Sequence, residues 1–437
     1  MKRLTIILVL LWLPSLLAHW ESFDSFFTWR HQLIMLSGLL ALGYMSIAVL
    51  LSLRLRWVET WTLGLDKSYQ IHKQLGIGAT VALIFHWLFV EGAKWLVQAD
   101  IIARPHKGPR PIVEGIQWRP IAESVGEWTF YLFLVFAVIS LIQAISYQKF
   151  KYVHKLGGLL MIAGVFHSLL LLDWNSPSMP MNIAIGALSI IGTVGALISL
   201  MGKIGSANRA SGIVKDVYRY STPDKPQVVR LRVQLSTPLQ VKHGQFVFLN
   251  FEDGETPHPF SILNYERDKG VIEFAIKALG DYTQHLTRHI QNGAAVSVEG
   301  GYGCFQISQT QNQAWVGAGI GIVPFVSRLY FLQKRGLEET RSYEKIHLFY
   351  CVNSRKEALF ESEIINLIRN LDFVVLHLVS AEDGEFLCAD RLVRSFEDSN
   401  YDVSFCGPKR FGKQLRAALM NYGLPKHDFH FERFTMR

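Results

Sequence analysis

The chain has 437 residues, of which 50% are hydrophobic and 18% are charged, and its formal net charge is +8. The length suffices for two or three domains, and the charged fraction is below the roughly 25% of ordinary soluble proteins, which excludes a chain that is soluble throughout. Much of the positive charge lies beside hydrophobic segments, which indicates membrane topology and excludes nucleic acid as the expected partner.

The cysteines lie only in the C-terminal half of the chain, and no two of them are spaced as CxxC. This arrangement excludes a disulfide framework or a zinc site and indicates reduced thiols in a cytosolic domain. The four residues are Cys304, Cys351, Cys388 and Cys406.

Six hydrophobic segments occupy the first 205 residues, and about 20 apolar residues in a helix are needed to cross a membrane. The first segment contains Pro14 and follows the basic start "MKR", so a signal peptide is the alternative interpretation. Because "LLAHW" is a poor cleavage site, we expect an uncleaved span instead. The expected spans cover residues 4–19, 32–53, 71–97, 127–147, 153–172 and 182–202.

Basic residues flank two of the links between these segments and follow the sixth segment, and all three places lie on one side of the membrane if all six segments cross it. Positive residues mark the cytoplasmic side, so the C-terminal half is predicted to be cytoplasmic. The basic loop at 98–125 is the exception on the outer side. The residues that orient the chain are Arg54, Arg56, Lys67, Lys73, Lys149, Lys151, Lys155, Lys203 and Arg209.

Two of the segments carry histidines at wide spacing. His72 and His86 lie in the third, and His154 and His167 in the fifth. A single such histidine would most simply bond a neighbouring helix, but ionisable residues at membrane depth are rare and usually functional. Fourteen helical positions span about 21 Å, most of the roughly 30 Å hydrocarbon core. Because imidazole is a common axial ligand of heme iron, the pattern predicts two b-type hemes stacked across the membrane.

The third and fifth segments run in the same direction, so His72 should pair with His154, and His86 with His167. Fourteen positions return to within about 40° of the same helix face, whereas thirteen end about 140° away. The fifth segment should therefore contain a bulge or local unwinding, or offer its ligands from different sides. Small residues would let flat macrocycles approach both helices, namely Gly76, Gly78, Gly157, Gly158 and Gly164.

Residues 210–306 alternate apolar and polar positions in short runs separated by Pro- and Gly-rich turns, which predicts a small antiparallel barrel. Two motifs stand out in it, "HPFSIL" at 258–263 and "IKALGDYTQHL" at 276–286. Each taken alone is also compatible with an ordinary strand and turn.

The last part of the chain begins with "AWVGAGIGIVPF" at 314–325, an apolar strand that runs into three glycines and then a helix. Such a turn places a pyrophosphate at the helix N-terminus, although Pro324 stands at the third glycine position of the usual fingerprint. The strand "KIHLFYCV" then ends in "NSR", and "VSFCGPKRF" at 403–411 ends a later strand.

Together these motifs resemble the NADPH oxidase / ferric reductase family over nearly the whole chain, and above all its compact bacterial members. The resemblance implies a multi-pass α-helical membrane domain with two hemes at 1–205. It implies an FAD-binding antiparallel β-barrel of the ferredoxin-reductase type at 206–306 and an α/β NAD(P)-binding domain at 307–437.

The same resemblance implies the residues of the flavin site. Phe260 would pack along the flavin and Ser261 would bond its reactive edge. A C-terminal aromatic residue would cover the flavin ring, with Phe434 as the candidate and Phe431 in reserve. The residues implied to contact FAD are His258, Pro259, Phe260, Ser261, Lys277, Gly280, Asp281, Tyr282 and Thr283.

In the nucleotide domain the resemblance places Cys406 near the transferred hydride. Ser354 and Arg355 would read a 2′-phosphate, Arg355 through charge-assisted bonds, which favours NADPH over NADH. The implied contacts to the dinucleotide are Gly317, Gly319, Gly321, Pro324, Ser354, Arg355, Cys406, Gly407 and Pro408.

The implied function is transfer of electrons from cytoplasmic NADPH through FAD and two hemes to an acceptor outside the cell membrane of a bacterium. The acceptor stays open between oxygen, which would give superoxide, and a ferric chelate. Val90 weakens the oxygen alternative, because animal oxidases resemble one another in having a further histidine at this place. A membrane subunit that relays electrons to an extracytoplasmic partner protein is the other hypothesis. No obligatory regulatory subunit is expected.

Overall fold

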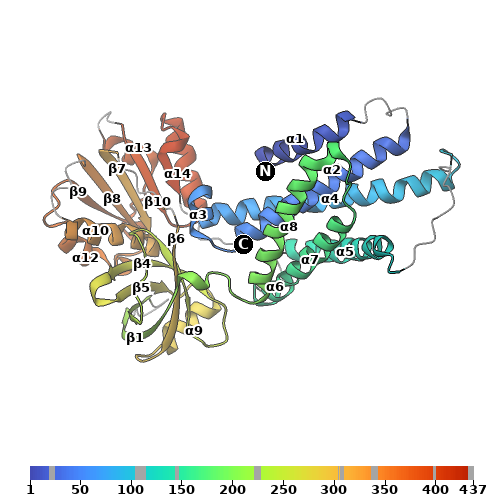
Figure 1. The fold of residues 1–437 in the computed structure, drawn as a ribbon. Coiled ribbons are helices and arrows are strands. Elements are labelled where there is room, and N and C mark those ends of the chain that lie inside the picture. The colour runs from blue at the N-terminus through green and yellow to red at the C-terminus, as the bar shows by residue number, and fades with distance from the viewer. Residues whose placement is uncertain are drawn as a thin grey trace. The chain divides into compact units, whose positions relative to one another are not determined.

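The computed structural model describes residues 1–18, 25–103, 115–142, 147–220, 228–303, 305, 310–335, 343–396 and 400–431. The chain divides into two compact units (Figure 1). One consists of Met1–Val58 and Lys67–Ile204, and the other of Glu59–Asp66 and Gly205–Arg437. The first is helical, and the second holds the strands of a barrel and of an α/β sheet.

Long apolar helices make up the first unit. Within the described ranges, five segments are long and apolar enough to cross a membrane, so the predicted total of six is not confirmed. The first helix, α1, has 17 residues and is shorter than the other candidates. The helices are α1 (Lys2–Ala18), α2 (Phe26–Ser52), α4 (Leu65–Gln98), α5 (Trp118–Leu141), α6 (Tyr147–Lys155), α7 (Gly157–Leu170) and α8 (Met179–Leu200), with the short α3 (Arg56–Thr62) between α2 and α4.

Helix α1 packs into the helical unit although it is short. Leu8 and Trp12 are buried in the common core. Gly43 on α2 permits a close approach, because a Cβ there would lie 2.6 Å from a methyl carbon of Leu8. Near the other end of α1, the hydroxyl of Ser15 lies 3.1 Å from that of Ser178, so polar contacts also tie α1 to its neighbours.

The segment that carries His154 and His167 is not one continuous helix. Helix α6 ends at Lys155 and α7 begins at Gly157, with Leu156 in a turn between them. The Leu156 N–H donates to the Val153 carbonyl at 3.0 Å, an i−3 contact of 3₁₀ type. The structure therefore contains a local irregularity, which is one of the two ways in which the thirteen-residue spacing could be accommodated.

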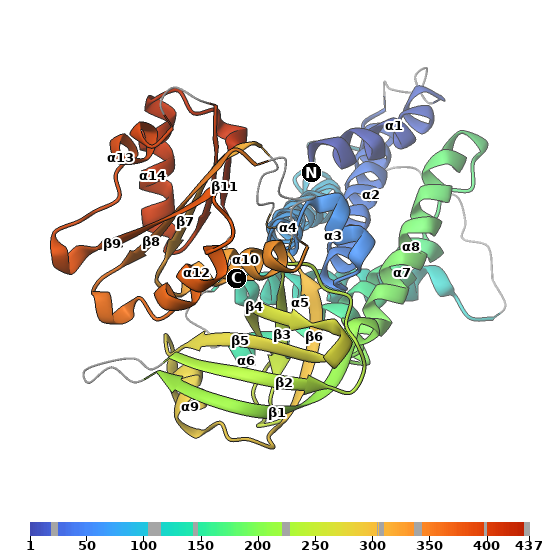
Figure 2. The same cartoon turned by 90° about the vertical axis from the view of Figure 1, so that its left-hand side faces the viewer.

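Within the described residues, six antiparallel strands close into a barrel in the order β1-β2-β5-β4-β3-β6 (Figure 2). Its inner side chains, including Leu231, Ile272, Phe274 and Val298, are fully buried. The predicted antiparallel barrel is confirmed. The strands are β1 (Arg209–Tyr220), β2 (Val228–Leu235), β3 (Phe246–Asn250), β4 (His258–Glu266), β5 (Val271–Lys277) and β6 (Ala295–Tyr302), with α9 (Asp281–His289) between β5 and β6.

The remaining strands form a parallel sheet in the order β11-β10-β7-β8-β9. Successive residues of β7 face opposite sides: Trp315 packs in a core with α10 and α12, whereas Val316 packs with α13 and α14. The sheet is thus covered on both faces, as parallel sheets are. The elements are β7 (Asn312–Ala318), α10 (Val323–Arg335), β8 (Lys345–Val352), α12 (Glu361–Ile368), β9 (Val374–Ser380), α13 (Ala389–Arg394), β10 (Asp402–Cys406), α14 (Lys409–Asn421) and β11 (Phe429–Phe431).

Candidate functional site

The four membrane histidines form two facing pairs. The rings of His72 on α4 and His154 on α6 have centroids 5.7 Å apart. The rings of His86 on α4 and His167 on α7 have centroids 6.2 Å apart. The structure therefore brings together the same partners that the parallel course of the two segments predicts.

Every one of these imidazoles is held through its Nδ1 atom. Nδ1 of His72 lies 2.8 Å from the Ala48 carbonyl, and Nδ1 of His167 lies 2.8 Å from the Ala122 carbonyl. Nδ1 of His154 lies 3.1 Å from the Ser140 hydroxyl. A carbonyl oxygen only accepts hydrogen bonds, so at His72 and His167 Nδ1 carries the proton and Nε2 keeps its lone pair for a metal.

His86 follows the same arrangement with two partners on α2. Its Nδ1 lies 3.1 Å from the Ile34 carbonyl and 3.2 Å from the Ser37 hydroxyl. A Cβ at Gly38 would come within 3.3 Å of the ring, so the glycine allows α2 to lie against it.

The separations of the two pairs suit a metal between them. An imidazole nitrogen binds a metal at about 2 Å, so rings on opposite sides of one ion have centres about 6 Å apart. Gly76 and Gly164 border open space, because a Cβ at either would meet nothing within 4 Å. The donor set and its spacing therefore fit two bis-imidazole hemes.

Some glycines serve contacts other than the predicted ones. A Cβ at Gly126 on α5 would lie 2.2 Å from Nδ1 of His167, so this residue sets the position of that ring. Gly157 instead packs against Phe136, and Gly158 against Leu200, at 2.8 and 2.9 Å for an added Cβ. Sequence patterns did not indicate Gly126 or Ser140, because both depend on how α5 packs on its neighbours.

In the barrel, the structure brings the two predicted flavin motifs together. His258 begins β4 and its ring stacks on Tyr282 at the start of α9, with centroids 4.2 Å apart and planes 14° apart. The Tyr282 hydroxyl donates to Asp253 at 3.0 Å. Burial lowers the pKa of His258 and raises that of Tyr282, so both rings are neutral near pH 7.

Other flavin candidates lie on the same two elements as this stacked pair, on β4 and at the start of α9. Pro259, Phe260 and Ser261 follow His258 along β4 opposite β3, each half-buried. Gly280 precedes α9, and the Thr283 hydroxyl accepts hydrogen bonds from the N–H groups of Leu279 and Gly280 at 2.9 and 3.0 Å. Asp281 is exposed in the first turn of α9. The helix start, with its unpaired first-turn N–H groups, suits a pyrophosphate.

The glycine-rich turn lies at the point where the strand order of the parallel sheet reverses, between β7 and β10. Gly319 has φ +56°, a conformation that favours glycine. A Cβ at Gly321 would lie 2.2 Å from the Cys406 carbonyl oxygen, so the turn touches the end of β10. Gly317 is equally confined, because a Cβ added there would lie 2.7 Å from Ile322. This is the position at which dinucleotides bind in open α/β sheets.

Two further predicted elements flank the turn. Pro324 lies in the first turn of α10, where its missing N–H costs no helical bond. Gly407 and Pro408 follow Cys406 and lead into α14, and a Cβ at Gly407 would lie 2.7 Å from Ala318 beside the glycine-rich turn. The structure thus places the Cys-Gly-Pro segment next to that turn, with the Cys406 side chain buried.

Arg355, which follows β8 and was predicted to bind a 2′-phosphate, already has an acidic partner in the structure. Arg355 is exposed and its Nε donates to Asp383 at 2.7 Å, so its charge is already paired. Lys356 instead lines a cavity of about 60 Å³ together with Lys277 and Gly319. Lys277 Nζ lies 3.5 Å from Glu357. Lys356 is therefore a cation beside the glycine-rich turn that the sequence motifs did not indicate.

The aromatic candidates at the C-terminus are only partly placed. Phe434 lies outside the described residues. Phe431 on β11 packs against Phe405, with ring centroids 5.3 Å apart, and against Gly412 of α14. Phe431 thus contributes to the core of the α/β domain.

Residues 37–165 match the family described as "Ferric reductase like transmembrane component", and residues 218–314 match the family described as "FAD-binding domain". The chain thus joins a domain that matches the ferric-reductase-like transmembrane family to one that matches the FAD-binding family. The first match includes His72, His86 and His154 and ends two residues before His167. The two matched domains are those of a membrane-bound oxidoreductase.

Curated relatives match part of the chain. Sulfhydrogenase 2 subunit gamma of Pyrococcus furiosus is 25% identical over 204 residues, 42% of this chain and 68% of the relative. Phenol hydroxylase P5 protein of Acinetobacter pittii is 25% identical over 224 residues, 48% and 62% of the two chains. A ferredoxin–NAD(P)⁺ reductase component of naphthalene 1,2-dioxygenase/salicylate 5-hydroxylase systems from Ralstonia is 27% identical over 216 residues. This match covers 47% of this chain and 64% of the relative. The matches to the latter two span less than two thirds of the relatives' length.

Solved structures show a weaker likeness. The ferredoxin reductase in carbazole 1,9a-dioxygenase is 18% identical, with a TM-score of 0.43, over 52% of this chain and 69% of that chain. Ferredoxin-NADP⁺ reductase from Plasmodium falciparum is 15% identical, with a TM-score of 0.44, over 52% and 97%.

Proposed function

We propose that this protein oxidises NADPH in the cytoplasm of a bacterium and delivers the electrons across the cell membrane to an acceptor outside. The observation that carries the proposal is the pair of facing imidazole sets, 5.7 and 6.2 Å between ring centroids, in one chain with a flavin-type barrel and a dinucleotide turn. Neither half alone would connect a soluble reductant to the far side of a membrane.

In this proposal His72 and His154 hold an inner heme, and His86 and His167 an outer one. Bound hemes would supply one-electron carriers within the membrane, and bound FAD the exchange between a hydride and single electrons. The carbonyls of Ala48 and Ala122 fix the ring orientation of His72 and His167 and leave the Nε2 lone pair of each for a metal.

The dehydrogenase residues position the two dinucleotides. Ser261 and Phe260 on β4 would contact the flavin, and the start of α9 would bind its pyrophosphate. The turn at Gly319 would bind the nicotinamide dinucleotide beside Cys406. Ser354 and Arg355 remain the proposed readers of the 2′-phosphate, and Arg355 would exchange Asp383 for that phosphate.

The orientation follows from the charges that flank the helices. Lys149, Lys151 and Lys155 belong to the α6 end of the helical segment that α7 completes, and the same end carries the inner pair. Positive residues favour the cytoplasmic side, so the pair of His72 and His154 would receive electrons first.

The acceptor is proposed to be oxygen or a ferric chelate. Arg30 on α2 donates to the carbonyls of Phe89 and Val90 on α4 at 2.8 and 3.1 Å. These bonds support a role for Arg30 in joining α2 to α4. His31 lies 3.5 Å from Asp173.

Purified protein in detergent, supplied with FAD and heme, tests the proposal with NADPH under air and then anaerobically with ferric citrate. Cytochrome c reduction in air that superoxide dismutase abolishes would identify oxygen as acceptor. Anaerobic iron reduction with little superoxide in air would identify the ferric chelate. Reduction of bound flavin and heme without turnover on either would identify a relay to a partner protein, and a protein that binds no heme would refute the proposal.

A further inference from the structure

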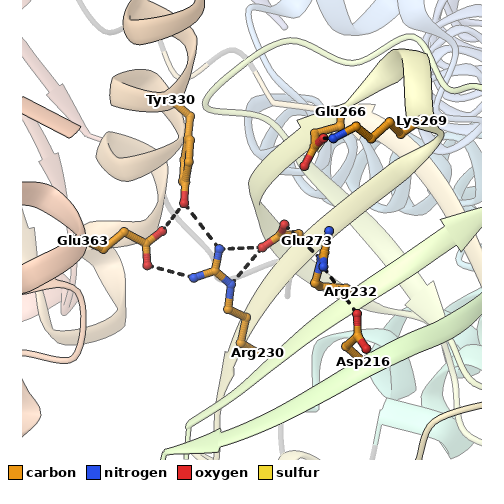
Figure 3. Close-up of polar contacts among 8 residues, drawn as sticks. All are labelled: Asp216, Arg230, Arg232, Glu266, Lys269, Glu273, Tyr330 and Glu363. Atoms are coloured by element: carbon orange, nitrogen blue, oxygen red, sulfur yellow. Dashed lines mark hydrogen bonds and ion pairs between the residues drawn. The ribbon is translucent and has the colours of Figure 1, made fainter. Parts of the chain in front are cut away.

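A partly buried polar network joins the barrel to the α/β domain within the second unit (Figure 3). Arg230 on β2 donates to Glu273 on β5 from Nε at 2.8 Å and from Nη2 at 2.5 Å. Its Nη1 donates to Glu363 on α12 at 2.8 Å. One guanidinium therefore binds a carboxylate in each domain at the same time.

Tyr330 on α10 completes the network on the α/β side. Its hydroxyl donates to Glu363 at 2.5 Å and lies 3.4 Å from Nη2 of Arg230. Burial, together with the carboxylate of Glu363, raises the pKa of Tyr330 to about 12, so the hydroxyl stays protonated and keeps donating. The side chains of Arg230, Glu273 and Glu363 are 17%, 7% and 19% exposed, which limits screening by water.

On the barrel side of the network, Glu273 is fixed by further ion pairs. Glu273 also binds Arg232 at 3.3 Å, and Arg232 reaches Asp216 at 3.4 Å. Loss of Glu363 would therefore leave Arg230 paired with Glu273, with no unpaired buried cation. The contact to Glu363 is thus a separable link between the domains.

A second contact between α10 and the barrel involves the opposite face of this helix. Arg328 lies two positions before Tyr330, about 200° around the helix. Its Nη1 lies 2.6 Å from Nε2 of His243, which precedes β3 in the barrel. With barrel contacts on opposite faces, α10 resists both displacement and rotation about its own axis.

Helix α10 begins directly after the glycine-rich turn, and it packs against β4, the strand that carries His258 to Ser261. The position of α10 therefore sets the distance between the glycine-rich turn and the predicted flavin-binding residues on β4. We propose that Arg230, Tyr330 and Glu363 are positioning residues that hold the nicotinamide at hydride-transfer distance from the flavin. This inference rests on the proposed function.

The test measures anaerobic flavin reduction by NADPH in a single turnover, in the full-length protein with FAD and heme. Misplacement of reacting groups by about 1 Å can cost on the order of 100-fold in rate. We expect Glu363→Gln to slow flavin reduction about tenfold and to raise the kinetic isotope effect with deuterated NADPH. FAD content and the dissociation constant for NADP⁺ should stay within about twofold. Tyr330→Phe, which removes one hydroxyl, should produce a smaller change in the same direction.

The matched control is Glu361→Gln, which removes an acidic group from the same helix, where Glu361 has no ion-pair partner among the described residues. An unchanged rate in Glu363→Gln and Tyr330→Phe would overturn the inference alone. A rate that falls only in proportion to lost FAD would also overturn it, because the network would then be structural. A wild-type protein whose flavin neither NADPH nor NADH reduces would overturn the proposed function as well.

Discussion

Gly126 illustrates how a residue without functional groups controls the position of a proposed heme ligand, His167. Helix α5 lies so close to His167 that an added Cβ would be 2.2 Å from Nδ1 and 2.4 Å from Cε1 of the ring. The same Nδ1 depends on the neighbouring Ala122 carbonyl at 2.8 Å. A side chain at this position must therefore move the ring, the helix or both.

We expect Gly126→Ala to lower heme content from two per chain toward one, because only the pair of His86 and His167 is disturbed. The pyridine hemochrome spectrum, normalised to protein and to FAD, measures this directly. Gly186→Ala on α8 is the control, since a Cβ there meets nothing within 4 Å. Full heme content in the Gly126 variant would show that His167 does not bind heme in this position.

The availability of Arg355 for a phosphate depends on another residue, Asp383. Its ion pair with Asp383 competes with any phosphate, and charge-assisted bonds of this kind contribute about 1.5–3 kcal/mol. Replacing Ser354 and Arg355 together by alanine should therefore weaken NADPH relative to NADH about tenfold, measured as the ratio of the two kcat/KM values. Arg394→Ala, which breaks an exposed pair with Asp390, should leave the ratio unchanged. Equal loss with both nucleotides would mean that Ser354 and Arg355 do not read the phosphate.

At the scale of elements, the break between α6 and α7 can be compared directly with a prediction from the sequence. The thirteen-residue spacing of His154 and His167 predicted either an irregular segment or ligands offered from different sides, and the turn at Leu156 is such an irregularity. The barrel and the glycine-rich turn were equally predictable, because strand alternation and glycine spacing are local patterns.

Other features depend on packing between distant segments and have no local signal. Arg230, Glu273, Tyr330 and Glu363 come from four different elements, and each taken alone is an ordinary surface residue in the sequence. The same holds for Ser140 beside His154, and for the pairing of Arg355 with Asp383. These contacts follow from the tertiary arrangement, which periodicity does not specify.

Strands β8 and β9 carry a histidine pair that should make stability depend on pH. Nδ1 of His347 lies 2.7 Å from Nε2 of His377. Burial, with contributions from His377 and Lys345, lowers the pKa of His347 from 6.5 to about 4. The unfolded chain thus binds a proton near pH 6.5 that the folded chain binds only near pH 4. Stability is fully present above pH 6.5 and falls as the pH drops toward 4.

At about 1.4 kcal/mol per pKa unit, the loss from His347 amounts to roughly 3 kcal/mol. Thermal unfolding followed by flavin fluorescence at pH 7.5 and pH 5 should show a larger decrease for the wild type than for His347→Phe. His427→Gln is the control, because His427 is exposed. An identical decrease in wild type and His347→Phe would show that another group causes the pH dependence.

For the whole molecule, the division into two compact units implies that the two half-reactions of the proposed function can be separated. His72 belongs to the helical unit, and the glycine-rich turn and the flavin segment belong to the other. Loss of a membrane histidine should therefore spare the chemistry between nucleotide and flavin.

We expect His72→Leu to keep flavin reduction by NADPH within about twofold of wild type while reduction of the outside acceptor falls at least about tenfold. Stopped-flow absorbance of flavin and heme, together with acceptor turnover in proteoliposomes, measures both steps. Retained acceptor turnover would mean that electrons leave the flavin without passing the inner pair. Both hemes at full occupancy would mean that His72 is not a ligand.

The length of α4 has a consequence for how the protein meets lipid bilayers of different thickness. Its 34 residues form one rod of about 51 Å, well beyond the roughly 30 Å of hydrocarbon. A long helix adapts to a thinner or thicker bilayer by tilting. Because His72 and His86 lie on this rod, tilting changes their depth in the lipid but not the distance between them. The rate of electron passage between the two pairs should therefore be insensitive to lipid chain length.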